Sequence, residues 1–273
     1  MKTALTRLFV GSAEVSMKRH LWVISAVLVL NLGLGATAIA LVGGAREIPN
    51  PKTQPEVMFV GSRGNFCTGT AITRDLVLTA AHCVLPGADY KLVELDAEKR
   101  PIFRDVVGVA RHQQFNLKAM LAHRATADVG LIKLATPLSI APIMLLPPRS
   151  RVVVGEPFVV RGYGTSVRND GNSAATLREA VLVATGQPGS LQLRLVDPAT
   201  GGTRNGLGAC TGDSGAPVYQ KTSTGLAVIG VVSWSTGPNG EGGCGGLTGV
   251  TPLELYRAWI VEQAIKMGSA IRP

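Results

Sequence analysis

The chain has 273 residues, of which 46% are hydrophobic and 16% charged. Such a chain can bury a substantial core, as one large domain or as two packed halves, and this excludes a disordered protein. The formal net charge is +9, yet no basic run interleaved with aromatic residues indicates a nucleic-acid partner, so we interpret the surplus as a solubility feature.

Residues 1–40 are typical of a secretory signal sequence. An apolar stretch, residues 21–34, follows a basic cluster at residues 18–20 and precedes a run of small residues, and Met17 is an alternative start. Apolar and small residues continue through Val42, so an uncleaved membrane anchor of about 20 residues is the other interpretation. We favour cleavage, because signal peptidase requires small residues at its cut site, and expect a secreted or periplasmic protein.

The body of the chain alternates short apolar runs with turn-forming segments rich in Gly and Pro. Many strand-sized runs without βαβ spacing predict antiparallel β-barrels in an all-β protein. The runs are residues 57–60, 70–79, 91–95, 106–110, 129–134, 152–161, 180–184, 191–196, 216–219 and 227–234.

Two further segments complete the predicted organisation. The proline-rich residues 137–148 are interpreted as a linker between two strand-rich halves. Near the C-terminus, Pro252 and Glu254 suit a helix start, and apolar residues then recur at helical spacing. These residues are Leu253, Tyr256, Trp259, Ile260 and Ile265.

The four cysteines are Cys67, Cys83, Cys210 and Cys244. An even number in an exported chain predicts two disulfides, for which the sequence allows three pairings; free core thiols are the alternative. A zinc site is not expected, because no second Cys or His stands two to four residues from any of the four.

A glycine-flanked turn, Cys-Thr-Gly-Asp-Ser-Gly-Ala-Pro at residues 210–217, would present the hydroxyl of Ser214 ahead of a strand. A serine is a weak nucleophile unless a base accepts its proton and a third group orients that base. His82, in Thr-Ala-Ala-His-Cys, and Asp128, which opens the apolar run at residues 129–134, supply these types. Each alone could be a turn or a core residue, but together they predict a triad.

In these three motifs, in the order His, Asp, Ser, the sequence resembles the chymotrypsin/trypsin family of serine endopeptidases. The resemblance extends from Leu41 to the C-terminal helix and implies that residues 41–273 form a trypsin-like protease domain. It implies two packed six-stranded antiparallel Greek-key barrels with a C-terminal α-helix. It also implies a monomer that hydrolyses protein or peptide substrates through an acyl-enzyme without cofactor or metal, and that contacts a membrane only if the signal is retained.

The resemblance carries over the roles of the general Ser-His-Asp template. Ser214 attacks the scissile carbonyl, His82 transfers the proton, and Asp128 orients the imidazole. The backbone N–H groups of Gly212 and Ser214 face the oxyanion.

The resemblance also implies both disulfides. Cys67–Cys83 would brace the histidine turn, and Cys210–Cys244 would lie beside the substrate pocket. A covalent cross-link at each place would help to keep His82 and Ser214 within hydrogen-bond reach of each other.

An activating N-terminus is implied by Leu-Val-Gly-Gly at residues 41–44. The ammonium of Leu41 would pair with the buried Asp213, which otherwise simply caps its turn. Family members are generally cut after a basic residue, whereas Ala40 precedes Leu41 here. We therefore hypothesise that signal peptidase itself exposes the activating amine; cleavage after Ala38 would leave a short inhibitory extension.

Specificity is interpreted from the residues that match the family's substrate pocket. Trypsins carry Asp at the pocket base, where this chain has Gly208, so we expect small or medium apolar P1 side chains. Ser233 is also expected to support Asp128 by a hydrogen bond. The full set of predicted substrate-binding residues is Gly208, Ala209, Ser233, Trp234, Ser235 and Gly249.

Two further alternatives remain open. A catalytically inactive binding module could use the same scaffold. The alternating Glu94, Asp96 and Glu98 could bind calcium, although a solvated face is the favoured interpretation. His112 and His123 are expected to have surface or packing roles.

Overall fold

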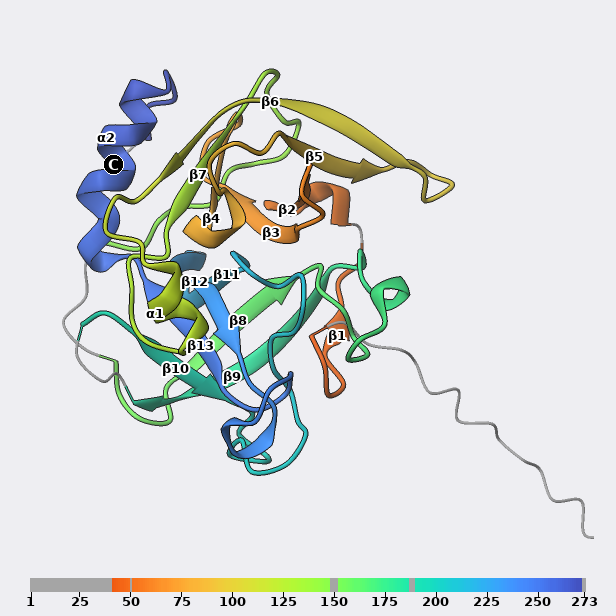
Figure 1. The fold of residues 1–273 in the computed structure, drawn as a ribbon, viewed down its shortest axis with the longest axis vertical. Coiled ribbons are helices and arrows are strands. Elements are labelled where there is room, and N and C mark those ends of the chain that lie inside the picture. The colour runs from red at the N-terminus through yellow and green to blue at the C-terminus, as the bar shows by residue number, and fades with distance from the viewer. Residues whose placement is uncertain (1–40, 50, 148–151, 187–189, 272–273) are drawn as a thin grey trace, which may run out of the picture. The chain divides into compact units, whose positions relative to one another are not determined.

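The computed structural model describes residues 41–49, 51–147, 152–186 and 190–271. The predicted signal segment and the last residue of the predicted linker, Pro148, lie outside the described residues. Within the described ranges, no helix is long and apolar enough to cross a membrane. Figure 1 shows the strands in two groups, β2 to β7 and β8 to β13, with helix α2 (Arg257–Lys266) beside the first group.

The first group of strands closes into an antiparallel barrel in the order β2-β3-β4-β7-β6-β5. Its strands are β2 (Glu56–Gly61), β3 (Phe66–Ala71), β4 (Leu76–Thr79), β5 (Tyr90–Leu95), β6 (Pro101–Arg111) and β7 (Gly130–Leu134). Closure leaves no unpaired sheet edge in this half of the chain.

The second group forms an antiparallel sheet that the β8–β9 pairing closes into another barrel, in the order β8-β9-β10-β13-β12-β11. Its strands are β8 (Pro157–Gly162), β9 (Arg178–Gly186), β10 (Leu193–Val196), β11 (Pro217–Thr222), β12 (Gly225–Ser235) and β13 (Thr248–Pro252), with β1 (Arg46–Glu47) added to β9. The order repeats that of the first barrel. The two-barrel fold with a C-terminal helix is thus confirmed.

Apolar cores fill both barrels and the contact between them. Phe59 and Leu92 belong to the core of the first barrel, and Phe158 and Leu182 to that of the second. A third core combines side chains from both barrels and from α2, namely Leu76, Leu78, Leu131, Tyr219, Val231, Ile260 and Ala264. Burial of each Leu, Ile or Val side chain in this set contributes roughly 1.5–3 kcal/mol, so this shared core holds the two barrels together.

The helix starts later than the sequence predicts. Pro252 ends β13, where it pairs with Gly230 of β12, and Glu254 lies in a 3-10 turn (Glu254–Tyr256). The α-helix begins only at Arg257. The start signals at Pro252 and Glu254 were therefore misplaced, because strand pairing continues through Pro252.

Three other elements differ from the predicted runs. The run at residues 70–79 is divided between β3 and β4 by a turn in which Thr73 and Asp75 hydrogen-bond one another. Strand β13 was missed, because its sequence, Thr-Gly-Val-Thr-Pro, has only one large apolar residue. A short helix, α1 (Leu117–Leu121), was missed as well; the side chain of Asn116 caps it by accepting the N–H of Ala119 at 3.0 Å.

Candidate active site

His82 and Asp128 lie against each other in the first barrel. His82 is in the 3-10 turn Ala81–Cys83 that follows β4, and Asp128 lies two residues before β7. The Nδ1 atom of His82 is 2.8 Å from Oδ2 of Asp128, and the His82 backbone N–H donates to Oδ1 at 2.9 Å. Since Nδ1 faces the carboxylate, Nε2 is the ring nitrogen left for another partner.

The Asp128 carboxylate is fully buried and receives a third hydrogen bond from the second barrel. Ser233 on β12 donates its hydroxyl to Oδ2 at 2.5 Å, as the sequence predicted. A buried carboxylate is tolerated only when donors replace its lost hydration. Three donors from two barrels therefore fix this group in one orientation.

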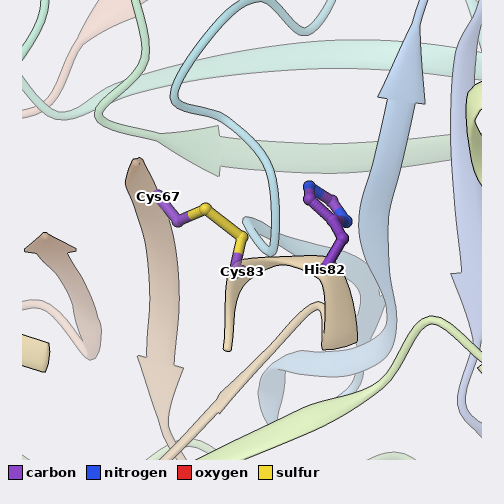
Figure 2. Close-up of side chains that lie close together, drawn as sticks. All are labelled: Cys67, His82 and Cys83. Carbon is purple, nitrogen blue, oxygen red and sulfur yellow. A yellow bond between two sulfur atoms is a disulfide. The ribbon is translucent and has the colours of Figure 1, made fainter. Parts of the chain in front are cut away.

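A disulfide flanks the histidine turn. Cys67 on β3 is bonded to Cys83, the residue after His82, and Figure 2 shows the His82 ring projecting from the turn beside this bridge. The two sulfur atoms and the imidazole lie close enough together to suggest metal ligands. Because the sulfurs are bonded to each other, neither is a thiolate available to a metal. The second disulfide, Cys210–Cys244, is also present.

In the loop that carries Ser214, some backbone N–H groups are hydrogen-bonded within the described part of the chain and others are not. Gly212 and Gly215 have φ of +93° and +78°, a region that favours glycine. The N–H groups of Asp213 and Gly215 donate to the carbonyls of Cys210 and Val232. Within the described part of the chain, the N–H groups of Gly212 and Ser214 have no hydrogen-bond partner. These two donors remain for a ligand.

The first barrel abuts this loop directly. A Cβ added to Gly215 would lie 2.0 Å from Oγ1 of Thr79 and 2.8 Å from the N atom of Ala80, just ahead of the His82 turn. A Cβ added to Gly212 would lie 2.7 Å from the Phe66 ring. The structure therefore brings the segments of His82, Asp128 and Ser214 together at the contact between the barrels.

Asp213, next to Ser214, is a fully buried acid. Its two oxygens accept the N–H groups of Gly164 and Cys210, both at 2.9 Å. A Cβ on Gly164 would lie 2.5 Å from its carboxyl carbon, so glycine makes room for it. Complete burial raises the pKa of Asp213 to about 7, despite these donors and the positive charge of Arg178.

The segment after the predicted signal lies against the second barrel. Leu41 is fully buried, in the same core as Ala209 and Ala216 on either side of the Asp213 loop. Val42 forms an isolated antiparallel bridge with Gly208. A Cβ on Gly43 would lie 2.2 Å from the backbone of Gly206, so only glycine fits at that position.

Two of the predicted pocket residues, Gly208 and Ala209, precede the Cys210–Cys244 disulfide. Gly208 packs against Gly245, to whose Cα an added Cβ would approach within 3.0 Å. Ala209 is fully buried, and its N–H donates to Oγ1 of Thr248 at 3.1 Å. No acidic side chain occupies position 208 or 209.

The other pocket residues lie on β12 and β13. The indole of Trp234 covers Gly249, whose added Cβ would lie 2.1 Å from its Cε2 atom. The imidazole of His123 stacks on the same indole, with ring centroids 4.8 Å apart. Ser235 donates its hydroxyl to the carbonyl of Gly243 at 3.2 Å. Ser233, also on β12, donates its hydroxyl to Asp128.

Sequence reasoning missed two residues that contact these groups, Gly164 and Thr68. Gly164, which binds Asp213, belongs to no motif of the sequence. His123 was expected to have a surface or packing role, and it packs by stacking on Trp234. Thr68 follows Cys67 and binds the Ser214 loop, whose residues lie far along the chain. His112 has the expected packing role, between Tyr256 and Trp259.

The acidic residues that had suggested calcium pair with arginines. Glu94 pairs with Arg104 at 2.8 Å, and Asp96 and Glu98 both pair with Arg100. These ion pairs fit the favoured interpretation of a solvated face.

Comparison with known proteins gives a consistent result. A sequence model described as Trypsin matches residues 42–260. Granzyme E of Mus musculus is 32% identical over 169 residues, an alignment that covers 58% of this chain and 65% of that protein. The snake venom serine protease rhinocerase 4 of Bitis rhinoceros is 29% identical, with 87% of this chain and 93% of that protein covered.

A solved structure has the same fold. It is described as neuropsin, a serine protease expressed in the limbic system of mouse brain, and is 23% identical in sequence. The superposition has a TM-score of 0.61 and covers 81% of this chain and 99% of the other.

Proposed function

This chain belongs to the trypsin family of serine-type endopeptidases, and from that premise we propose that it is an exported protease using His82, Asp128 and Ser214 as its catalytic triad. The observation that carries the proposal is the bonding of Asp128. Its buried carboxylate accepts hydrogen bonds from the ring and the backbone N–H of His82 and from the hydroxyl of Ser233. This arrangement fixes the imidazole tautomer that a general base requires.

In the proposed reaction, Ser214 Oγ attacks the carbonyl carbon of the scissile bond while Nε2 of His82 takes the hydroxyl proton. The imidazolium then gives this proton to the leaving amine, and the acyl-enzyme forms. Water, deprotonated by the same nitrogen, then attacks the ester carbonyl, and the imidazolium returns the proton to Ser214 Oγ as the acyl–oxygen bond breaks. Asp128 orients the imidazole and stabilises the imidazolium.

The unpaired N–H groups of Gly212 and Ser214 support a role as oxyanion donors. Charge develops on the carbonyl oxygen in the tetrahedral state, and donors without another partner can bind it without reorganisation. Loss of one such donor raises the barrier by about 3 kcal/mol in other serine hydrolases. Substitution of the glycines would disturb these donors, because both turns need left-handed backbone.

A serine-directed fluorophosphonate tests the function itself. We expect the exported wild-type protein to gain the mass of one phosphonyl group and to lose peptide hydrolysis in step with labelling. A protein that starts at Leu41 and does not label would instead be the inactive binding module. The control is Ser214→Ala, which keeps the scaffold and lacks the serine expected to be labelled.

Activation is proposed to depend on a pair between the Leu41 ammonium and Asp213. An extension before Leu41 removes the ammonium and leaves Asp213 with a pKa of about 7, against 3.8 when unperturbed. Since the folded pKa is raised, the neutral acid is favoured, and stability is lost as pH rises from about 4 through 7. This difference corresponds to about 4 kcal/mol.

We therefore expect the extended form to lose about 4 kcal/mol of unfolding free energy between pH 4 and pH 7.5, relative to the form that starts at Leu41. In the latter form, the ammonium lowers the pKa of Asp213 and removes the loss. Urea unfolding of both forms at the two pH values measures this. The extended form is the protein that starts at Ile39, whose two extra residues carry no titratable side chain, so parallel pH profiles of the two forms would contradict the pairing.

Substrate preference is proposed to be for small or medium apolar P1 side chains. No carboxylate stands at Gly208 or Ala209 to pair with a basic P1 residue. We expect alanyl, leucyl or phenylalanyl peptide amides to exceed arginyl and lysyl ones in kcat/KM by at least about 10-fold, since an unpaired buried cation is costly. A matched series of fluorogenic peptides that differ only at P1 measures this, and a preference for arginine would overturn it.

A further inference from the structure

We propose that Thr68 is a positioning residue that holds the oxyanion loop, residues 210–215, in the shape that leaves the Gly212 and Ser214 N–H groups free. The inference deepens the proposed function and rests on it. It assigns to the first barrel, which carries His82 and Asp128, a second task of shaping the nucleophile loop of the other barrel.

Thr68 reaches the loop with both its side chain and its backbone. It lies on β3, is fully buried, and donates its hydroxyl to the carbonyl of Gly212 at 2.8 Å. The same hydroxyl accepts the N–H of Tyr163 at 3.1 Å. The Thr68 N–H donates to the carbonyl of Ser214 at 3.0 Å. Three hydrogen bonds thus run from one strand of the first barrel to the second barrel.

The hydrogen-bond partners of the carbonyls of residues 211–214 show why these bonds matter. The carbonyls of Thr211 and Asp213 accept N–H groups of the second barrel, from Thr165 at 2.8 Å and Ala216 at 2.9 Å. The carbonyls of Gly212 and Ser214 both bind Thr68. Thr68 therefore fixes the two peptide units that contain the Gly212 and Ser214 carbonyls, which directly follow the free N–H groups of the same two residues.

Glycine makes this restraint necessary. Gly212 has a φ of +93° and no side chain, so its backbone has more accessible conformations than that of any other residue type. Without the Thr68 hydroxyl, the Gly212 carbonyl and the Tyr163 N–H would both be buried with no partner, which favours rotation of the loop toward one. Rotation of the backbone at Gly212 would turn the N–H groups of Gly212 and Ser214 away from the oxyanion.

The test compares Thr68→Val, which keeps the shape but lacks the hydroxyl, with Thr68→Ser, which keeps the hydroxyl. Thr70→Val is the matched control. Thr70 lies on the same strand, is equally buried, and its hydroxyl has only long contacts of 3.4 and 3.5 Å. All variants are made in the full chain and assayed as exported protein, below the temperature at which any of them unfolds.

We expect Thr68→Val to lower kcat by about 10- to 100-fold, with KM changed by less than about 3-fold, because the lost interaction acts on the transition state. The affinity of a peptide boronate, whose tetrahedral adduct places an oxygen against the free N–H groups, should fall by a similar factor. Thr68→Ser should restore kcat to within about 3-fold of wild type, and Thr70→Val should match wild type.

Equal kcat and boronate affinity in Thr68→Val and wild type would overturn the inference. Parallel losses in Thr68→Val and Thr70→Val would overturn it as well, because they would indicate a general packing effect. If Thr68→Val does not accumulate as folded protein, Thr68→Ala replaces it with the same expectations. A wild-type protein that hydrolyses no peptide and takes no fluorophosphonate overturns the proposed function itself, and this inference with it.

Discussion

Replacing Ser214 with alanine is expected to lower kcat by a factor on the order of 10⁴–10⁶. The substitution removes the nucleophilic oxygen and leaves the backbone of the loop unchanged, so the N–H groups of Gly212 and Ser214 can still bind an oxyanion. Hydrolysis would then depend on water alone. The rate on a fluorogenic peptide and the intact mass after fluorophosphonate treatment together measure the loss.

The matched control is Ser223→Ala, in the exposed turn between β11 and β12. It removes the same hydroxyl without touching the site and should match wild type in both readouts. Phosphonyl labelling of Ser214→Ala, or a residual kcat above roughly a thousandth of wild type, would show that another residue is the nucleophile.

Replacing Asp128 with asparagine is expected to lower kcat by about 10⁴-fold, the loss that this change causes in the general Ser-His-Asp template. An amide presents an N–H₂ group where the carboxylate accepts from His82 or Ser233. The imidazole is then held in the wrong tautomer, and its cation is no longer stabilised by a negative charge. KM should change little, because Asp128 is fully buried and does not face substrate.

Asp75→Asn provides the control for this exchange. Asp75 pairs with Lys133 at 2.5 Å, and this pairing helps to lower the pKa of the Asp75 carboxyl even though its partial burial acts in the opposite direction. Replacing the carboxylate of Asp75 with a neutral amide should therefore reduce the stability of the protein. It lies outside the candidate site, and kcat should stay within about twofold of wild type. If Asp128→Asn were no more impaired in kcat than Asp75→Asn, Asp128 would have a structural role only.

The two exchanges report on different parts of the site. Ser214→Ala should abolish labelling by fluorophosphonate, whereas Asp128→Asn should retain it at a much lower rate. If the wild-type protein does not label either, it is the binding module or an unactivated precursor. N-terminal sequencing separates these two cases. A start at Leu41 would indicate the former, and an earlier start the latter.

Much of the site could be predicted because its groups fall in short motifs. The Ser214 turn, the His82 turn and the acid before β7 each combine a reactive side chain with the local backbone that presents it. The barrels were predictable because buried strands leave apolar runs of characteristic length. Strand β13 and helix α1 escaped because their sequences lack that pattern.

The sequence by itself determined which residues we propose to carry the chemistry, which cysteines were available for disulfides, and that Asp213 follows Gly212 in a glycine-bounded loop. Only the tertiary structure decided what holds these groups. Thr68 and Gly164 bind residues that lie far away in the chain, and no local sequence pattern marks them. The physical reason is that a hydrogen bond between distant segments depends on how the strands and barrels pack, and this packing follows from cores shared by many segments rather than from any single motif.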